Sequence, residues 1–305
     1  MKIQKVAVIG SGTMGNGIAH VFAQYGYDVH LVDINENALQ KALQTISKNM
    51  DRQIAKGIIT EQDKQQALQR IKTFTSIENA VTDRDLVVEA ATENPTIKLD
   101  IFKKLDILTP SHCILASNTS SISITKIAAV TNRPEKVIGM HFMNPVPVMK
   151  LVEIINGFKT SEETNQIITD TAKNLQKVPV TVNDFPGFVS NKVLMPLINE
   201  AIYTLYEGIA GVEEIDTIIK LGMAHPMGPL QLADFIGLDV CLYIMQVLYE
   251  GYGNPKYAPC PLLVKMVDSG NLGVKSGMGF YDYSNKDSKE LVVAPQFKKR
   301  KKELI

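Results

Sequence analysis

A glycine-rich turn near the start of the chain has the composition and spacing of a dinucleotide-binding site. A short β-rich run at residues 6–9 leads into the sequence GSGTMG, and a helical pattern follows. In a G-x-G-x-x-G turn the first glycine permits a tight bend, the second lets the backbone approach a pyrophosphate, and the third lets the helix pack close to the strand. The N–H groups at the start of that helix would then face the phosphates. The candidate cofactor-binding residues of this turn are Gly10, Gly12, Thr13, Met14 and Gly15.

An acidic residue supports this interpretation and indicates which cofactor binds. A second short strand is expected at residues 29–32, and Asp33 follows it directly. Its distance from the glycine turn is near the ~20 residues that the motif requires. A carboxylate there can accept a hydrogen bond from the adenosine ribose, but it would repel a 2′-phosphate. The residues from Ile34 to Glu36 include no arginine to receive such a phosphate. NAD is therefore expected in preference to NADP.

Three further segments could place catalytic side chains beside the nicotinamide. They are SNTSS at 117–121, HFMNP at 141–145 and KLVE at 150–153. Each follows or ends a predicted strand, and open α/β sheets bind ligands at the carboxyl ends of their strands. Hydride transfer from a secondary alcohol needs a base for the hydroxyl proton, and His141 suits that role near neutral pH. Glu153 could hold the imidazole and stabilise its charged form, and Ser120 could hydrogen-bond the reacting oxygen.

Taken singly, each of these residues also has an ordinary structural explanation. A lone histidine in an apolar segment is more often a core residue than a catalyst, and the serine-rich segment could be a turn or a helix N-cap. Glu153 could be a surface residue of a strand. The other histidines are interpreted as core or surface residues: His20, His30, His112 and His225. No pair of histidines has metal-ligand spacing such as HExxH, so no metal site is expected.

The elements that must position these residues alternate between strand and helix. Besides the two strands already described, strands are predicted at 71–74, 86–89, 113–116, 137–140, 151–155 and 178–182. Helical stretches separate most of them, which argues for a parallel, doubly wound sheet and an α/β Rossmann-like NAD-binding domain. Whether the last two strands keep the parallel order is left open by the sequence.

A pair of polar helices is expected as a helical-hairpin insertion in this domain. The first helix has an apolar stripe made of Leu39, Leu43, Ile46, Met50 and Ile54. Gly57 is a plausible stop, and the segment from Thr60 to Asp63 resembles a capping box that opens the second helix. Most lysines of the pair are expected to face solvent.

The composition changes after the last predicted strand. A turn signal at 184–187 precedes a strongly apolar helix at 188–207, in which Pro196 should cause a kink. A helix that is apolar on nearly every side needs burial against another domain or subunit, which predicts a homodimer. The pattern beyond it is helical. The chain is therefore expected to consist of an NAD-binding domain at 1–185 and an all-α C-terminal dimerisation and substrate domain at 186–305.

Composition argues against several classes of partner. The 305 residues carry 32 basic and 32 acidic side chains, so the formal net charge is zero and the usual footprint of a nucleic-acid binder is lacking. Cys113, Cys241 and Cys260 are too few and too scattered for a disulfide framework or a zinc site. No run approaches the ~18 apolar residues of a membrane span. A cytoplasmic protein with no nucleic-acid or membrane partner is expected, and the basic run at 298–302 is interpreted as a solvated chain end.

Several motifs in the same order resemble the 3-hydroxyacyl-CoA dehydrogenase family, and in particular its short, single-function members that act on 3-hydroxybutyryl-CoA. The likeness runs from about Val6 to Tyr283. It rests on SNTSS, HFMNP, KLVEI, PGFVSNK at 186–192, AHPMGP at 224–229 and GVKSGMGFYDY at 273–283. The resemblance implies a catalytic base at His141 and a carboxylate partner at Glu153.

Further roles follow only from the resemblance. Ser120 and Asn191 match the substrate-side hydrogen-bonding pair of the family. Lys56 and Asn49 fall where the family's helical hairpin meets CoA, although serine is more usual at the position of Asn49. Besides Asp33, the residues implied to contact NAD outside the glycine turn are Glu93, Lys98 and Asn118. The family often has FIVNR where this chain has FVSNK, a departure that leaves Asn191 unchanged.

The sequence thus predicts an NAD-dependent enzyme that interconverts L-3-hydroxyacyl-CoA and 3-oxoacyl-CoA, with a short-chain substrate such as 3-hydroxybutyryl-CoA. One alternative is a related NAD-dependent dehydrogenase that acts on a free hydroxy acid or a sugar acid. Another is a non-catalytic NAD-binding protein. The sequence leaves the chain-length preference, the physiological direction and the pathway open.

Overall fold

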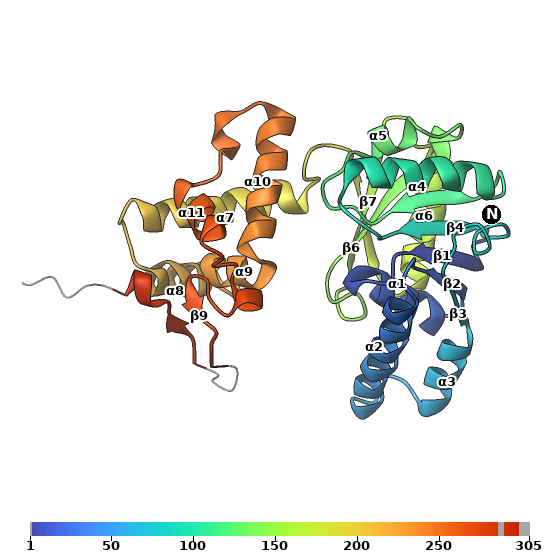
Figure 1. The fold of residues 1–305 in the computed structure, drawn as a ribbon, viewed down its shortest axis with the longest axis horizontal. Helices are drawn as coiled ribbons and strands as arrows, with labels where there is room; N and C mark the ends of the chain where they lie inside the picture. The colour runs from blue at the N-terminus through green and yellow to red at the C-terminus, as the bar shows by residue number, and fades with distance from the viewer. Residues whose placement is uncertain (1, 286–289, 299–305) are drawn as a thin grey trace, which may run out of the picture. The chain divides into compact units, whose positions relative to one another are not determined.

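A computed structural model describes residues 2–285 and 290–298 (Figure 1). The chain divides between Phe188 and Val189 into two compact units. The sequence predicts the domain boundary slightly earlier, at 185. Most of the basic run at 298–302 lies outside the described residues. Each unit has its own hydrophobic core and is described separately below.

The first unit is built on an eight-stranded sheet in the order β3-β2-β1-β4-β5-β6-β7-β8. Its strands are β1 (Lys5–Ile9), β2 (Asp28–Val32), β3 (Ile71–Phe74), β4 (Leu86–Glu89), β5 (Ile114–Ser117), β6 (Val137–Phe142), β7 (Leu151–Asn156) and β8 (Val178–Asn183). All neighbouring strands are parallel except β6 and β7, which are antiparallel. The connection at 143–150 contains no helix, and a connection without a crossover element returns the chain antiparallel. The sequence left the direction of the last two strands open. In the structure β7 runs antiparallel to β6, and β8 runs parallel to β7.

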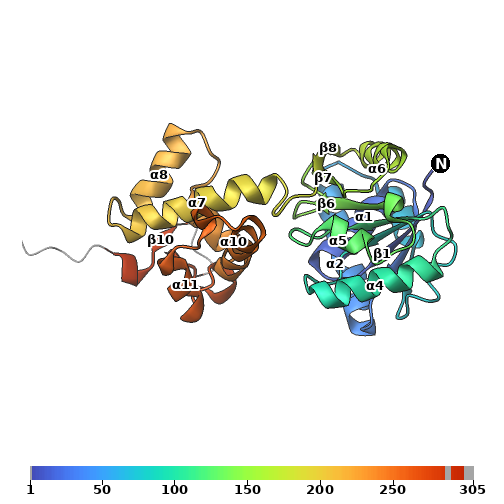
Figure 2. The ribbon, with the colours of Figure 1, turned by 90° about the horizontal axis from the view of Figure 1, so that it is seen from above.

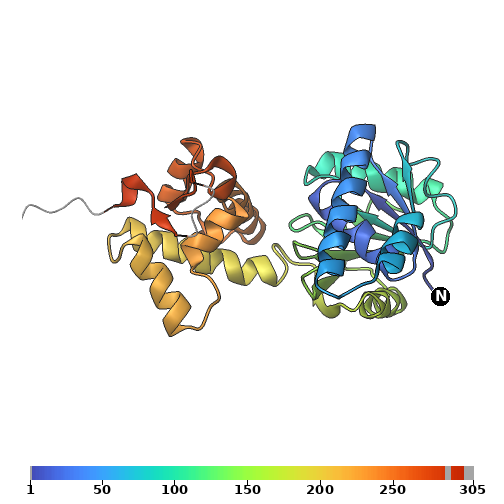
Figure 3. The same cartoon turned by 90° about the horizontal axis from the view of Figure 1, so that it is seen from below.

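Helices cover both faces of this sheet, as Figures 2 and 3 show from above and from below. They are α1 (Thr13–Gln24), α2 (Glu36–Ala55), α3 (Glu61–Gln69), α4 (Pro95–Leu108), α5 (Ile124–Ala128), η1 (Pro134–Lys136) and α6 (Glu162–Asn174). Side chains of β1 alternate between two cores: Val6 and Val8 pack with α1, α2 and α6, whereas Ala7 and Ile9 pack with α4 and α5. This alternation confirms the predicted doubly wound, Rossmann-like architecture.

Helices α2 and α3 form the expected hairpin, which extends beyond the sheet in Figure 1. Leu39, Ile46 and Met50 of the predicted stripe are buried in the core of the first unit. The capping box is also confirmed, because the Thr60 hydroxyl accepts a hydrogen bond from the Asp63 N–H while the Asp63 carboxylate accepts one from the Thr60 N–H. Local signals therefore determine where α3 begins.

The second unit is mainly helical. Its elements are α7 (Ser190–Tyr206), α8 (Val212–Gly222), α9 (Pro229–Ile236), α10 (Leu238–Tyr252), η2 (Pro255–Tyr257), α11 (Pro261–Asp268), η3 (Val274–Ser276), β9 (Tyr281–Asp282), β10 (Val292–Val293) and η4 (Pro295–Phe297). The antiparallel pair β9–β10 corrects the expectation of an all-α domain. Two-residue strands are too short to show the alternation from which strands are predicted. Within the described residues no single helix could cross a membrane, although α9 and α10, which are bent by 97°, pass the length and composition test together.

Helix α7 begins two residues later than the sequence suggests, because Gly187 and Phe188 adopt φ angles of +75° and +49°. Left-handed residues cannot belong to a right-handed helix. The apolar side chains of this helix are only partly buried: Met195 and Ile198 are buried, whereas Val193 is 67% exposed. Part of the apolar surface of α7 therefore remains exposed in the single chain.

Two buried carboxylates tie the C-terminal segment of the second unit to its helices. Asp234 accepts hydrogen bonds from the N–H groups of Phe280 and Tyr281 and from the Tyr283 hydroxyl. Asp216 accepts one from the Tyr281 hydroxyl at 2.8 Å. Burial raises the pKa of Asp234 to about 6, since desolvation penalises the charged form more than these donors stabilise it.

This pKa predicts a pH-dependent stability. Because the folded-state pKa of Asp234 is above its ordinary value, protonation of this carboxyl stabilises the folded state. This stabilisation is fully present below about pH 4 and is lost above about pH 6. We expect the Tm difference between wild type and Asp234→Asn to shrink by about 5 °C between pH 4.5 and 7. Thermal unfolding followed by circular dichroism tests this. Asp268→Asn, at an exposed position of α11, is the control, and a pH-independent difference for Asp234→Asn would contradict the assignment.

Candidate active site

The centre of the candidate site is a histidine–carboxylate pair on adjacent strands. His141 on β6 and Glu153 on β7 are register partners, and the imidazole Nδ1 lies 2.8 Å from the Glu153 Oε2. Both residues are buried, with 8% and 3% of their surface exposed. Because a carboxylate only accepts, Nδ1 carries the hydrogen and Nε2 is left as the nitrogen that can take up a proton. The predicted approach of these two residues is confirmed.

Neighbouring residues fix the imidazole in place. The Asn118 Oδ1 accepts a hydrogen bond of 2.9 Å from the N–H of Phe142, the residue that follows His141. The ring of Phe188 lies 6.1 Å from the imidazole, measured between centroids. The contact of Asn118 with NAD stays a prediction. Phe188, whose φ is +49°, is a neighbour of His141 outside the predicted site residues.

Glu93 holds the hydroxyl-rich turn that carries Ser120. Its carboxylate accepts hydrogen bonds from the Thr119 hydroxyl at 2.7 Å, from the Ser120 N–H at 3.1 Å and from the Ser121 hydroxyl at 3.3 Å. Three bonds to one carboxylate make this turn stiff. Glu93 was predicted to contact NAD. That contact stays a prediction, but the carboxylate already has a positioning role within the first unit.

Lys98 is in a buried charge network. Its ammonium group is 1% exposed, forms an ion pair with Glu89, and lies 3.5 Å from the Ser117 hydroxyl. Ser117 in turn donates to Glu89 at 2.7 Å, and the second Glu89 oxygen accepts from the Ala91 N–H. The network joins the carboxyl ends of β4 and β5 to α4. Glu89 is not among the predicted site residues, although an acid that ends an apolar strand is a usable signal. The contact of Lys98 with NAD remains a prediction.

The glycine turn has the geometry that nucleotide binding requires. A Cβ on Gly10 would lie 2.6 Å from the Ala90 carbonyl oxygen, and one on Gly15 would lie 1.8 Å from the Gly10 carbonyl oxygen. Both positions are therefore closed to larger residues. A Cβ on Gly12 would meet nothing within 4 Å, so this backbone is open to a ligand. The first turn of α1, which includes Thr13 and Met14, has no side-chain cap, and its N–H groups can receive a phosphate.

Asp33 has a second role that the sequence did not reveal. One carboxylate oxygen accepts hydrogen bonds from the N–H and the hydroxyl of Ser11, at 2.9 Å and 2.7 Å. The other accepts from the Asn35 N–H at 3.1 Å. The residue expected to bind the ribose thus also holds the glycine turn. Its backbone neighbour Ile34 is 95% exposed.

A cavity of about 590 Å³ adjoins the glycine turn and Asp33. Its walls include five isoleucines: Ile9, Ile34, Ile77, Ile97 and Ile101. A cavity with apolar walls and a carboxylate at its edge suits a flat aromatic base attached to a ribose. The residues that line this cavity therefore fit the adenosine half of a dinucleotide.

A second cavity, of about 440 Å³, lies on the other side of the turn, between α1, α2 and the 144–147 segment. Lys41, Thr45 and Asn49 line it from one face of α2, since they are spaced by four residues. Lys56 is the C-cap of α2 and does not line this cavity. The structure therefore brings Asn49, but not Lys56, to the groove beside the turn, and Lys41 is a groove residue that sequence analysis missed.

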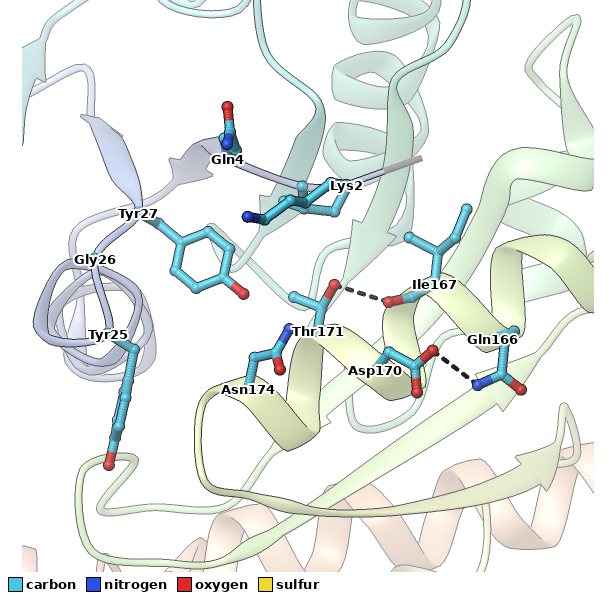
Figure 4. A pocket seen from close by; sticks show the side chains of 11 residues that line it. Lys2, Gln4, Tyr25, Gly26, Tyr27, Gln166, Ile167, Asp170, Thr171 and Asn174 are labelled. Atoms are coloured by element: carbon cyan, nitrogen blue, oxygen red, sulfur yellow. Dashed lines mark hydrogen bonds between the residues drawn. The ribbon is translucent and has the colours of Figure 1, made fainter.

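A further hollow, of about 700 Å³, lies at the opposite end of the sheet (Figure 4). Tyr25 and Tyr27 line it near the start of β2, while Lys2 and Gln4 come from the segment before β1. Its α6 side chains are bonded within the unit, for example Gln166 to Asp170 at 2.9 Å. The amino ends of strands are not where α/β sheets usually bind ligands, and no predicted site residue lies here.

The remaining candidate, Asn191, lies in the first turn of α7 and thus in the second unit. Its role in substrate binding stays a prediction. The described residues contain no group of three or more His, Cys, Asp or Glu side chains that could hold a metal ion. His20 and His30 are buried, as interpreted from the sequence, whereas His225 is exposed.

Two family models match the chain. The NAD binding domain of 3-hydroxyacyl-CoA dehydrogenase matches residues 5–185, and the C-terminal domain of 3-hydroxyacyl-CoA dehydrogenase matches residues 187–283. The first match agrees with the open backbone at Gly12 and the position of Asp33. The cofactor is NAD.

Relatives and solved structures agree with these matches. A probable 3-hydroxybutyryl-CoA dehydrogenase of Bacillus subtilis is 55% identical over 94% of this chain and 100% of its own length. A 3-hydroxybutyryl-CoA dehydrogenase of Bradyrhizobium diazoefficiens is 53% identical over 92% of this chain and 96% of its own. The crystal structure of (S)-3-hydroxybutyryl-CoA dehydrogenase from Ralstonia eutropha is similar with a TM-score of 0.90 and 51% identity, over 92% of this chain and 99% of that one. This chain belongs to the 3-hydroxyacyl-CoA dehydrogenase family.

Proposed function

We propose that this chain oxidises L-3-hydroxyacyl-CoA to 3-oxoacyl-CoA with NAD, and catalyses the reverse reaction, with a short-chain substrate such as 3-hydroxybutyryl-CoA. The observation that carries this proposal is the buried His141–Glu153 pair at the end of the sheet that also holds the nucleotide turn. The relatives that share about half of its residues are named for the same reaction on 3-hydroxybutyryl-CoA.

His141 acts as the general base in this proposal. Its Nε2 accepts the proton of the substrate 3-hydroxyl, and the Glu153 carboxylate, bonded to Nδ1, stabilises the imidazolium that forms. NAD, which the glycine turn and Asp33 would hold, would supply the acceptor for the hydride of C3, where a carbonyl group is left. Ser120 donates a hydrogen bond to the reacting oxygen, and Asn191 is its proposed partner in holding the substrate. The turn that carries Ser120 is stiffened by Glu93, so little motion is needed at the moment of reaction.

We also propose that the chain forms a homodimer through its second unit. Large apolar side chains remain exposed there in the single chain, among them Val193, Ile218, Leu221, Met223 and Phe235. Exposed apolar residues in such number mark an interaction surface. Static light scattering is expected to give twice the 33.7 kDa chain mass at micromolar concentration. A stable monomer would refute this proposal.

Three expectations about surroundings remain proposals: a cytoplasmic location, the lack of a nucleic-acid partner and the lack of a membrane partner. The balanced charge of the chain is the observation behind the second. Cell fractionation and a nucleic-acid retention assay would test them.

The first test of function is turnover. The wild type is expected to oxidise NADH with acetoacetyl-CoA and not with free acetoacetate, which separates this proposal from an enzyme for free hydroxy acids and from a non-catalytic protein. His141→Gln should lower kcat about 10²–10⁴-fold because the base is lost. Its NADH affinity should change little, because His141 does not belong to the glycine turn. Near-wild-type kcat in His141→Gln would remove histidine from the mechanism.

Glu153→Gln tests the coupling within the pair. This change keeps the shape of the side chain but removes the charge that stabilises the imidazolium formed in the reaction, so kcat should fall while the Kd of NADH changes little. A wild-type kcat in Glu153→Gln would show that the carboxylate takes no part in the proton transfer.

The CoA contact can be tested with two lysines of one helix. Lys56→Ala should raise KM for acetoacetyl-CoA and leave KM for a pantetheine-truncated substrate unchanged, because only the nucleotide part of CoA carries phosphates. Lys41→Ala is the matched variant, since Lys41 lines the groove beside Asn49 and Lys56 does not. If only Lys41→Ala raises KM for the full substrate, the phosphate contact lies in the groove and not at Lys56.

A further inference from the structure

The outer face of α4 forms one wall of the cavity beside the glycine turn. Four residues of this helix line the cavity of about 590 Å³: Ile97, Asp100, Ile101 and Lys104. Residues three and four apart lie on one face of a helix. The other face of α4 is buried in a core of the first unit, with Phe102 and Leu105 fully covered. The helix therefore presents alternating apolar and charged side chains to the cavity.

Asp100 contributes little to the stability of the fold. Its side chain is 59% exposed and makes one hydrogen bond to another described residue, from the Lys103 ammonium to Oδ1 at 3.0 Å. Lys103 is 56% exposed, and an exposed ion pair of residues three apart on a helix is weak. The other carboxylate oxygen is left for a donor outside the described residues.

The apolar residues of this wall suit the base of the cofactor. The cofactor is NAD, and Asp33, at the edge of the same cavity, is the residue predicted for its ribose. Ile97 and Ile101 offer an apolar surface to the flat face of the adenine ring. A base that rests on these two side chains has its polar edge beside Asp100, which lies between them in the sequence and on the same helix face.

The chemistry of a carboxylate determines which part of the base Asp100 can bind. A carboxylate only accepts hydrogen bonds. In adenine joined to ribose the exocyclic amino group is the N–H donor, whereas the ring nitrogens accept. Lys104, one turn further along α4, only donates, and it can serve ring nitrogens that other purines also possess. On this wall, Asp100 is therefore the residue that can distinguish adenine from a purine with a carbonyl oxygen in place of the amino group.

We propose that Asp100 selects the adenine base of the cofactor by accepting a hydrogen bond from its exocyclic amino group. Ile97 and Ile101 contact the face of the ring, and Asp100 binds its edge. This role concerns the cofactor alone and does not depend on the acyl-CoA substrate.

The test compares NADH with reduced nicotinamide hypoxanthine dinucleotide, which has a carbonyl oxygen in place of the amino group. The Kd of each is measured on the free enzyme from the fluorescence of the dihydronicotinamide ring. The wild type should bind NADH more tightly, and Asp100→Ala should reduce the ratio of the two Kd values about 3- to 10-fold, the range of one hydrogen bond. The two dinucleotides carry the same charge, so the loss of a negative field alone would leave this ratio unchanged.

Asp100→Asn gives an independent measurement. A carboxamide both donates and accepts, so it can bind the carbonyl oxygen of hypoxanthine as well as the amino group of adenine. The Kd of the hypoxanthine dinucleotide should therefore fall about 3- to 10-fold, while the Kd of NADH changes less.

Lys103→Ala is the matched control, because Lys103 pairs with Asp100 but does not line the cavity. This variant should keep the wild-type ratio within about 2-fold. An unchanged ratio in Asp100→Ala or in Asp100→Asn, or equal Kd values for the two dinucleotides in the wild type, would overturn the role of Asp100. These measurements need no turnover, so failure of the wild type to reduce acetoacetyl-CoA would refute the proposed function and leave base selection by Asp100 intact.

Discussion

The site depends on one buried interaction, the hydrogen bond between His141 and Glu153. A carboxylate removed from water is costly unless it is bonded to a strong donor, and Glu153 has one in the imidazole Nδ1 at 2.8 Å. The bond requires β7 to run antiparallel to β6, because only this register places the two residues opposite each other. The reversal of the sheet after β6 is thus the feature of the fold that makes the proposed chemistry possible.

The same principle extends to the neighbouring strand ends. Glu89 and Glu93 are each surrounded by donors, from Lys98 and Ser117 in one case and from Thr119 to Ser121 in the other. Each carboxylate joins segments that are distant in the sequence. A buried polar network whose members are satisfied is rigid, and rigidity is what a base and a hydrogen-bond donor need if they are to meet a substrate in one geometry.

The second unit uses similar means for a different purpose. Asp216 and Asp234 hold the C-terminal segment through backbone N–H groups and tyrosine hydroxyls, and the Lys192 ammonium, in the first turn of α7, lies over the Tyr252 ring. Positions where a side chain would collide with these carboxylates are glycines, such as Gly279, whose Cβ would lie 1.9 Å from an Asp234 oxygen. Buried polar residues therefore organise both units. In the first unit they surround the candidate active site, and in the second they lie at the ends of helices.

The sequence by itself determined the nucleotide turn, the strands, the helical hairpin and the candidate pair of His141 and Glu153, because these depend on local periodicity, on glycine spacing and on short motifs. Only the tertiary structure decided the reversal of β7, the burial of Lys98 against Glu89 and the hold of Asp33 on Ser11. Each of these is a contact between distant segments. The tertiary structure also decided that α7 begins at Ser190 and that β9 pairs with β10. Left-handed backbone angles and two-residue strands leave no periodic trace in a sequence, since they arise from packing and not from local propensity.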